Sequence, residues 1–223
     1  VDFTPDFVWV KCRSNTHDHQ LTDSVRGTSK ALTANTTNAE EDWDVLYSGN
    51  NKGMGDYVNG GFILDDDGNN ARYNNTGQTY VAWCWKGGGA AVSNSDGTIT
   101  SSISVNQEAG FSIVSYTGNG TAGATVGHGL NKKPAWIILI RRDSTGSRYV
   151  YHQFMNQGSN PEQHFSELNF HGGATDSNNV HNDTAPTTSV FSLSNNNASN
   201  GNTYTYIAYC WAEIPGYSKF GEY

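Results

Sequence analysis

Apolar side chains occur in short runs that are separated by stretches rich in Gly, Asn, Ser and Thr. Residues 7–11 (FVWVK), 80–85 (YVAWCW) and 136–140 (WIILI) are apolar at almost every position. Such runs are typical of central strands whose two faces are both covered. Residues 20–26 (QLTDSVR) instead alternate between polar and apolar, which indicates a strand with one face in solvent. The pattern therefore predicts an all-β protein.

The strongest strand signals occur twice along the chain. Residues 5–14 (PDFVWVKCRS) resemble residues 134–143 (PAWIILIRRD): each has a proline, an aromatic two positions later, an apolar stretch and a basic exit. Residues 79–86 (TYVAWCWK) match residues 205–212 (TYIAYCWA), with six of eight positions identical or similar in shape. The separation is 129 residues for the first pair and 126 for the second, so the two alignments support each other. A tandem repeat explains this better than chance similarity between aromatic strands.

The repeat divides the chain into two expected modules. We predict two tandem β-sandwich (jelly-roll-like) modules, residues 1–86 and residues 110–223, each with about six strands and long Asn/Gly loops. Residues 87–109 are expected to form a flexible Gly/Ser-rich linker, in which residues 98–105 (TITSSISV) alternate like an exposed strand. A short helix is expected around residues 38–43, since glutamates suit a first helical turn.

Composition and charge indicate which classes of binding partner are expected. The hydrophobic fraction is 35% and aromatics reach 12%, which favours strands over helices. The formal net charge is -8 and no basic stripe is present, so we expect no nucleic-acid partner. No run approaches the roughly 18 apolar residues of a membrane span, so no membrane insertion is expected.

Three cysteines, Cys12, Cys84 and Cys210, are spread along the chain. Three are too few and too scattered for a disulfide framework or a zinc site, and an odd number leaves at least one thiol free. We expect them to be small buried hydrophobic residues.

Metal candidates are weak, and no cofactor is expected. His17 and His19 have the spacing that places two imidazoles on one face of a strand, but a loop gives the same sequence and no third ligand is near. Asp65, Asp66 and Asp67 resemble a Ca²⁺ loop, although the alternating spacing and the final bidentate Glu are missing. A solvated turn is the simpler interpretation of these carboxylates.

An acidic cluster is the most serious indication of an enzyme. Trp43 is surrounded in the sequence by Glu40, Glu41, Asp42 and Asp44. Glycoside hydrolases use a pair of carboxylates for catalysis, and an aromatic ring can stack on the sugar. The second repeat has no acidic cluster at the corresponding place, and the chain contains neither a nucleophile elbow nor a His-Glu-x-x-His motif. We therefore expect no enzymatic activity and keep a glycan depolymerase as the third hypothesis.

Several phrases of the sequence resemble a known family. They include residues 4–14, 23–27 (DSVRG), 80–86, 110–120 (GFSIVSYTGNG), 126–130 (VGHGL) and 206–213. They are similar to the tandem modules of uncharacterised structural proteins of tailed phages, especially marine ones, which are usually described as tail-fibre-like. The resemblance covers nearly the whole chain and implies a repetitive protein on the exterior surface of the virion. It implies no catalytic residues.

The first functional hypothesis is therefore a non-enzymatic structural protein of a tailed phage, either a fibre or spike segment or a capsid-surface decoration. Its expected partners are other virion proteins and further copies of itself, as a trimer or a polymer, because edge strands invite pairing. The alternative is a carbohydrate-binding module that recognises host-surface glycans. In that hypothesis exposed rings of Trp43, Tyr57 and Tyr73 stack on sugars.

Overall fold

A computed structural model describes residues 1–46, 53–65 and 72–222. Strands make up 41% of the chain and helices 5%, so the all-β prediction is confirmed. In the described ranges, no helix is long and apolar enough to cross a membrane. The expected helix around residues 38–43 is misplaced: residues 41–42 form a short strand, and a single helical turn, α1 (Trp43–Leu46), begins where the prediction ended.

The first repeat forms a five-stranded antiparallel sheet in the order β4-β3-β2-β1-β7. Its strands are β1 (Phe7–Cys12), β2 (Gln20–Asp23), β3 (Gly27–Thr33), β4 (Glu41–Asp42) and β7 (Tyr80–Trp85). The β2–β3 turn is fixed by the Asp23 side chain, whose Oδ1 accepts hydrogen bonds from the backbone N–H of Val25 and Arg26. The turn closes at Gly27, whose φ of +98° disfavours other residues.

The second repeat contributes most of an eight-stranded sheet in the order β15-β14-β13-β12-β17-β10-β9-β8. Its strands are β8 (Val92–Asn94), β9 (Ser101–Asn106), β10 (Phe111–Thr117), β12 (Trp136–Arg141), β13 (Arg148–His152), β14 (His164–Glu167), β15 (Thr175–Asp176) and β17 (Thr205–Trp211). Strands β8 and β9 lie in the segment expected as a linker. That segment therefore completes the second sheet, because β9 pairs with β10 along its length.

The glycines after β7 serve close packing. The N–H of Gly87 donates to Asp6 Oδ2 at 2.8 Å, and the N–H of Gly88 donates to Ser104 Oγ at 2.9 Å. A Cβ on Gly88 would lie 2.4 Å from the carbonyl oxygen of Val105. This part of the segment is thus held against β9, in contrast to the flexible link expected from its composition.

The repeated strands occupy equivalent places in the two sheets. In the first sheet β1 pairs with β2 on one side and β7 on the other. In the second sheet β12 pairs in the same way with β13 and β17. The sheets differ at one edge: β17 has β10 as a further neighbour, whereas β7 is the last strand of its sheet.

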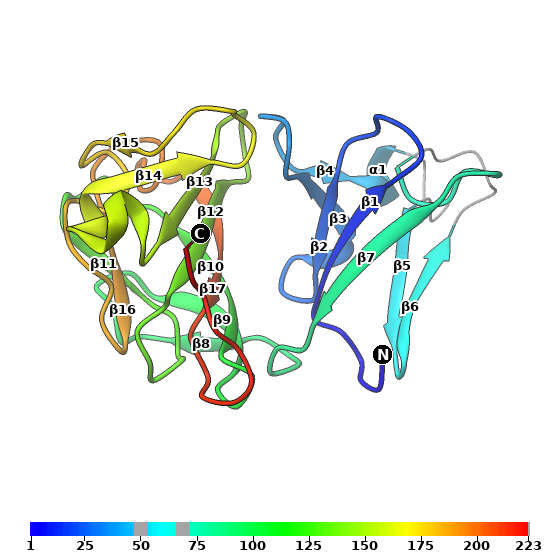
Figure 1. Cartoon of the computed structure of the whole chain (residues 1–223), viewed down its shortest axis with the longest axis horizontal. Coiled ribbons are helices and arrows are strands. Elements are labelled where there is room, and N and C mark those ends of the chain that lie inside the picture. Colours follow the sequence, from blue (N-terminus) through cyan, green and yellow to red (C-terminus); the bar gives the residue numbers. More distant parts are fainter. Residues whose placement is uncertain (47–52, 66–71, 223) are drawn as a thin grey trace.

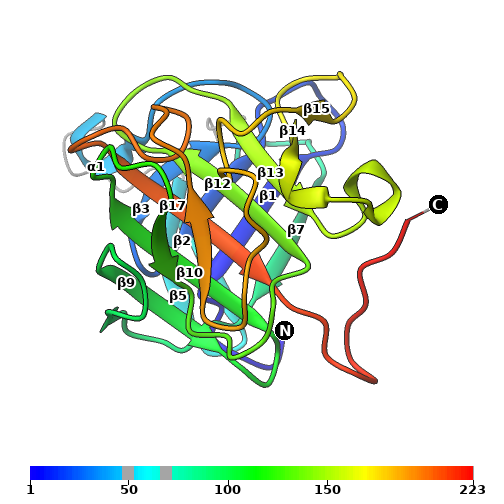
Figure 2. The same cartoon turned by 90° about the vertical axis from the view of Figure 1, so that its left-hand side faces the viewer.

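The two large sheets pack face to face, and a small two-stranded sheet covers the outer face of each (Figure 1). The hairpin β5 (Gly53–Val58) and β6 (Gly61–Asp65) lies outside the first sheet. The pair β11 (Ala124–Gly127) and β16 (Val190–Leu193) lies outside the second (Figure 2). The 3-10 turns η1 (Met155–Gly158) and η2 (Pro161–Gln163) connect β13 to β14. The β layers therefore number four along the long axis.

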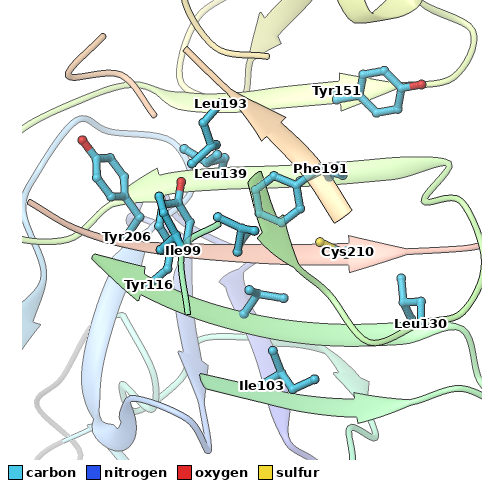
Figure 3. Close-up of a cluster of buried hydrophobic side chains, with 14 of the residues drawn as sticks. Ile99, Ile103, Tyr116, Leu130, Leu139, Tyr151, Phe191, Leu193, Tyr206 and Cys210 are labelled. Atoms are coloured by element: carbon cyan, nitrogen blue, oxygen red, sulfur yellow. The ribbon is translucent and has the colours of Figure 1, made fainter. Parts of the chain in front are cut away.

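Three apolar cores separate these layers. The core between the second sheet and the β11–β16 pair contains Tyr116, Leu139, Phe191 and Cys210 (Figure 3). The core between the first sheet and its hairpin is smaller and is centred on Trp43. The central core joins the two sheets and contains a stack of aromatic rings from both repeats, namely Phe7, Trp85, Phe111, Tyr209 and Trp211.

Candidate functional site

The structure places the proposed sugar-stacking rings inside the protein. Trp43 is 4% exposed and Tyr73 is 1% exposed, and their rings meet edge to face with centroids 5.4 Å apart. Tyr57 is half-buried, and its hydroxyl donates to Thr22 Oγ1 at 2.8 Å. The expectation that Trp43 and Tyr73 are exposed is wrong, because both rings fill the space between the first sheet and its hairpin, over Gly53.

The weak metal candidates are not brought together. His17 and His19 lie in the loop between β1 and β2, and the ring of His19 packs 6.3 Å from that of Trp9. Burial lowers the pKa of His19, and the charge of Lys11 lowers it further. No group of three His, Cys, Asp or Glu side chains able to hold a metal ion occurs among the residues that the structure describes.

The Ca²⁺ candidates remain a prediction. Asp65 is the last residue of β6, while Asp66 and Asp67 lie outside the described residues. All three cysteines are free thiols, with Cys12 and Cys210 buried and Cys84 partly exposed.

The acidic cluster around Trp43 is largely neutralised by basic neighbours. Glu41 accepts from Arg72 Nη1 at 2.6 Å, and Asp42 accepts from Lys30 Nζ at 2.5 Å. Asp44 is exposed on α1. These ion pairs keep the acidic side chains at the surface while the indole between them turns inward, which explains why an acidic sequence surrounds a buried tryptophan.

A buried ionic cluster lies between the two sheets. Arg26 Nε donates to Asp23 Oδ2 at 2.5 Å, and both side chains are fully buried. From the opposite sheet, Tyr209 Oη donates to the same Asp23 oxygen at 2.7 Å and accepts from Arg26 Nη2 at 3.0 Å. Burial alone would lower the pKa of Arg26, but the charge of Asp23, with Tyr209 and Glu40, raises it above its ordinary value. The guanidinium is therefore charged inside the protein.

Glu40 extends this cluster to the second sheet. Its carboxylate accepts from Arg26 Nη1 at 3.1 Å and is bound by the Nε and Nη2 of Arg142, each at 2.8 Å. Burial would raise the pKa of Glu40, but the hydrogen bond from Arg142 and the charge of Arg26 hold it below its ordinary value. Two-pronged arginine–carboxylate contacts of this kind also fix geometry. Glu40 thus joins the end of β12 to the first sheet.

Arg148 makes the third contact across the interface. Its side chain is fully buried, and its Nε donates to the carbonyl oxygen of Thr33 at 2.7 Å. The two Nη groups donate to the carbonyl oxygens of Gly146 and Asn38. Burial lowers the pKa of Arg148 to about 10. Its charge is solvated by backbone carbonyls of both repeats, and no carboxylate ion-pairs with it within the described ranges.

Replacing Arg148 by lysine is expected to lower the free energy of unfolding by about 1–3 kcal/mol, because one ammonium cannot reach all the carbonyls that the guanidinium reaches. Urea unfolding at neutral pH measures the change. Arg13 is exposed, so Arg13→Lys serves as the matched control and is expected to shift stability by less than about 0.5 kcal/mol. Equal midpoints for the two variants would contradict a structural role for Arg148.

Sequence reasoning missed most of this cluster. Asp23 and Arg26 stood in an alternating strand and its turn, where charged residues suggest solvent. One sequence feature could have indicated the cluster. Arg142 comes soon after the uninterrupted apolar run of residues 136–140, and we interpreted it only as a basic residue that ends the strand. A strand buried on both faces delivers the charged residues at its end close to the core.

Comparisons with known proteins give one result. A search of curated proteins and a search of solved structures found no match. One family model, described as a domain of unknown function (DUF7483), matches residues 1–223. Because this match spans the whole sequence, the chain belongs to the DUF7483 family.

Proposed function

We propose that this protein is a non-enzymatic structural component on the exterior of a tailed-phage particle, as a fibre or spike segment or a capsid-surface decoration. The observation that carries the proposal is the clamp between the two sheets. Asp23, Arg26 and Tyr209 form its buried centre, and Glu40 and Arg142 form its rim.

A clamp of this kind suits a protein that has to resist deformation. The central aromatic core holds the sheets together by apolar burial, which does not depend on the direction of the contacts. The ionic contacts and the Arg148 hydrogen bonds are directional, so they fix the relative position of the two sheets. Separating the sheets would break the contacts of Tyr209 with Asp23, of Arg142 with Glu40 and of Arg148 with Thr33. Arg26, Glu40 and Arg142 lie in the turns and loops that connect the strands, so the clamp also fixes these connections.

The resemblance to tandem modules of phage structural proteins supplies the biological setting of the proposal. The glycan-binding alternative loses two of the three rings on which it depended, since Trp43 and Tyr73 are buried. Tyr57 is half-buried and engaged with Thr22, so it offers no flat exposed face. A structural role is therefore the better supported of the two hypotheses.

Mass spectrometry of purified intact particles tests the proposal. We expect peptides of this chain to be present in particles that infect the natural host. Antibodies raised against the folded protein are expected to label those particles without disruption. Detection in infected-cell lysate but never in washed particles would overturn the proposal. Labelling only after disruption would show an internal protein and contradict the exterior position.

A further inference from the structure

The open edge of the first sheet is the surface that carries a further inference. The N–H of Arg13 donates to the carbonyl oxygen of Thr79 at 2.7 Å, and this antiparallel ladder continues along β1. Alternate residues of β7 therefore use their backbone groups towards β1. The N–H and C=O groups of Ala82 and Cys84 point to the other side, where no strand of the described ranges pairs with β7.

The sequence of β7 is that of a covered strand. Residues 80–85 (YVAWCW) are apolar at every position, and this pattern predicts a central strand, yet the structure places β7 at an edge. Ala82 is exposed, and Trp83 is 44% exposed. β7 therefore has the composition of a strand that is paired on both sides, but within the described residues it is paired with β1 alone.

The second repeat shows how such an edge is covered. Its equivalent strand, β17, pairs antiparallel with β10, so that Ala208 lies opposite Val114 and Cys210 opposite Ser112. These are the positions that match Ala82 and Cys84 in the repeat. The same strand type thus takes an antiparallel partner on this side wherever one is available in the chain.

The other edges of the two large sheets are less suited to pairing. β4 and β15 each have two residues, and each includes an acidic one. β8 has three residues. Short and charged edges are how proteins avoid edge-to-edge association, whereas β7 has six residues and contains neither proline nor charge.

We propose that β7 is a dimerisation edge, which pairs antiparallel with β7 of a second copy across a two-fold axis at Trp83. The two five-stranded sheets then become one continuous sheet. In this register Ala82 lies opposite Cys84 of the partner subunit, and the outward backbone groups of these two residues are satisfied in both strands. Lys86 lies opposite Tyr80 of the partner subunit, so no like charges meet, and each Trp83 ring is covered by its mate.

The occupant is a second copy because the strand is complementary to itself. Only registers that place outward-facing residues opposite one another can form the ladder, and the register centred on Trp83 brings Ala82 and Cys84 of both strands together. This inference specifies the self-association expected of the proposed structural role and rests on that role for its biological meaning. The two can fail separately, as the experiments below show.

A cysteine at the two-fold axis gives the direct test. Opposed residues of a non-hydrogen-bonded pair have Cα atoms about 4.5 Å apart, within the range that a disulfide spans. In a Cys84→Ala background, Trp83→Cys is expected to form a disulfide-linked dimer with oxidised glutathione at least ~10 times faster than a collision control, since pairing raises the local thiol concentration. Non-reducing gels of the full chain measure the rate.

Two matched controls accompany this variant in the same background. Ile63→Cys replaces a residue of similar exposure, 45%, on the β5–β6 hairpin, and its cross-linking rate measures random collision. Val92→Cys places the thiol on β8, an edge strand of the other sheet. A Trp83→Cys rate no higher than that of Ile63→Cys would overturn the proposal, and so would faster cross-linking through Val92→Cys.

The second arm removes only the outward hydrogen bond. Ala82→Pro deletes an N–H that points away from β1, so the intramolecular ladder is retained. Sedimentation velocity is expected to show a dimer for the unmodified chain and a monomer for Ala82→Pro across the micromolar range. A monomeric unmodified chain, or a dimeric Ala82→Pro chain that is folded by circular dichroism, contradicts the proposal. Absence of the chain from particles overturns the proposed function but leaves these results unchanged.

Discussion

Replacing Asp23 by alanine is expected to lower the free energy of unfolding by about 3–5 kcal/mol, because it leaves the Arg26 guanidinium buried without its closest counter-charge. Asp23 accepts two backbone hydrogen bonds in the β2–β3 turn, and its Oδ2 receives both Arg26 Nε and the Tyr209 hydroxyl. Alanine removes all of these acceptors at once. Chemical denaturation at neutral pH measures the loss.

The matched control is another ion pair of the same sheet. Asp42 contacts Lys30 at 2.5 Å, the same distance as in the Asp23–Arg26 pair, but both side chains are about one-third exposed. Solvent screens such a pair, so Asp42→Ala is expected to cost at most about 1 kcal/mol. Tyr209→Phe, which deletes only the hydroxyl shared by Asp23 and Arg26, is expected to cost about 1–3 kcal/mol. Similar losses for Asp23→Ala and Asp42→Ala would refute the buried clamp.

Acidification from pH 6.5 to pH 4 is expected to remove up to about 3 kcal/mol of stability through each of two buried histidines. Burial lowers the pKa of His128 from 6.5 to about 4, although its contact with the Thr187 carbonyl opposes this. Burial lowers the pKa of His181 to about 4 as well. The unfolded chain takes up these protons near pH 6.5 and the folded chain only near pH 4. Stability is therefore complete above pH 6.5 and falls as the pH is lowered.

The slope of unfolding free energy against pH measures this effect. Between pH 6 and pH 4.5 these two histidines are expected to contribute up to about 2.7 kcal/mol per pH unit to the slope, and His19 and His152, whose pKa values burial also lowers, add to it. His181→Phe keeps the edge-to-face contact with Tyr151 and removes one titrating group, so it should lower the slope by up to about 1.4 kcal/mol per pH unit. His171→Phe, in an exposed loop, is the control for the His-to-Phe replacement itself. A wild-type slope near zero would refute buried neutral histidines.

The strands could be predicted from sequence because a strand that is buried on both faces has apolar side chains at almost every position. Residues 7–11, 80–85 and 136–140 were expected as strands from apolar runs and lie in β1, β7 and β12. What an apolar run cannot record is which neighbour covers each side of a strand. β7 therefore looked central although it lies at an edge, and the strands within residues 87–109 looked like part of a linker although they complete the second sheet.

The candidate site was harder to predict because local polarity does not determine the direction of a side chain. Trp43 stands among four carboxylates and was expected at the surface. Its acidic neighbours pair with Lys30 and Arg72 instead, and the indole turns inward. Arg148 was passed over because a basic residue in a polar segment gives no sign that it will be buried among backbone carbonyls.

The aromatic stack of the central core has a consequence for how the protein is made. The ring of Phe7 lies 4.2 Å from that of Tyr209, which the ribosome adds 202 residues later. Until β17 has left the exit tunnel, the inner face of the first sheet, with Phe7, Leu21 and Leu32, has no permanent cover. Contacts so distant in sequence form slowly, and exposed apolar strands attract other nascent chains. The first half of this protein is therefore a natural client for chaperones during translation.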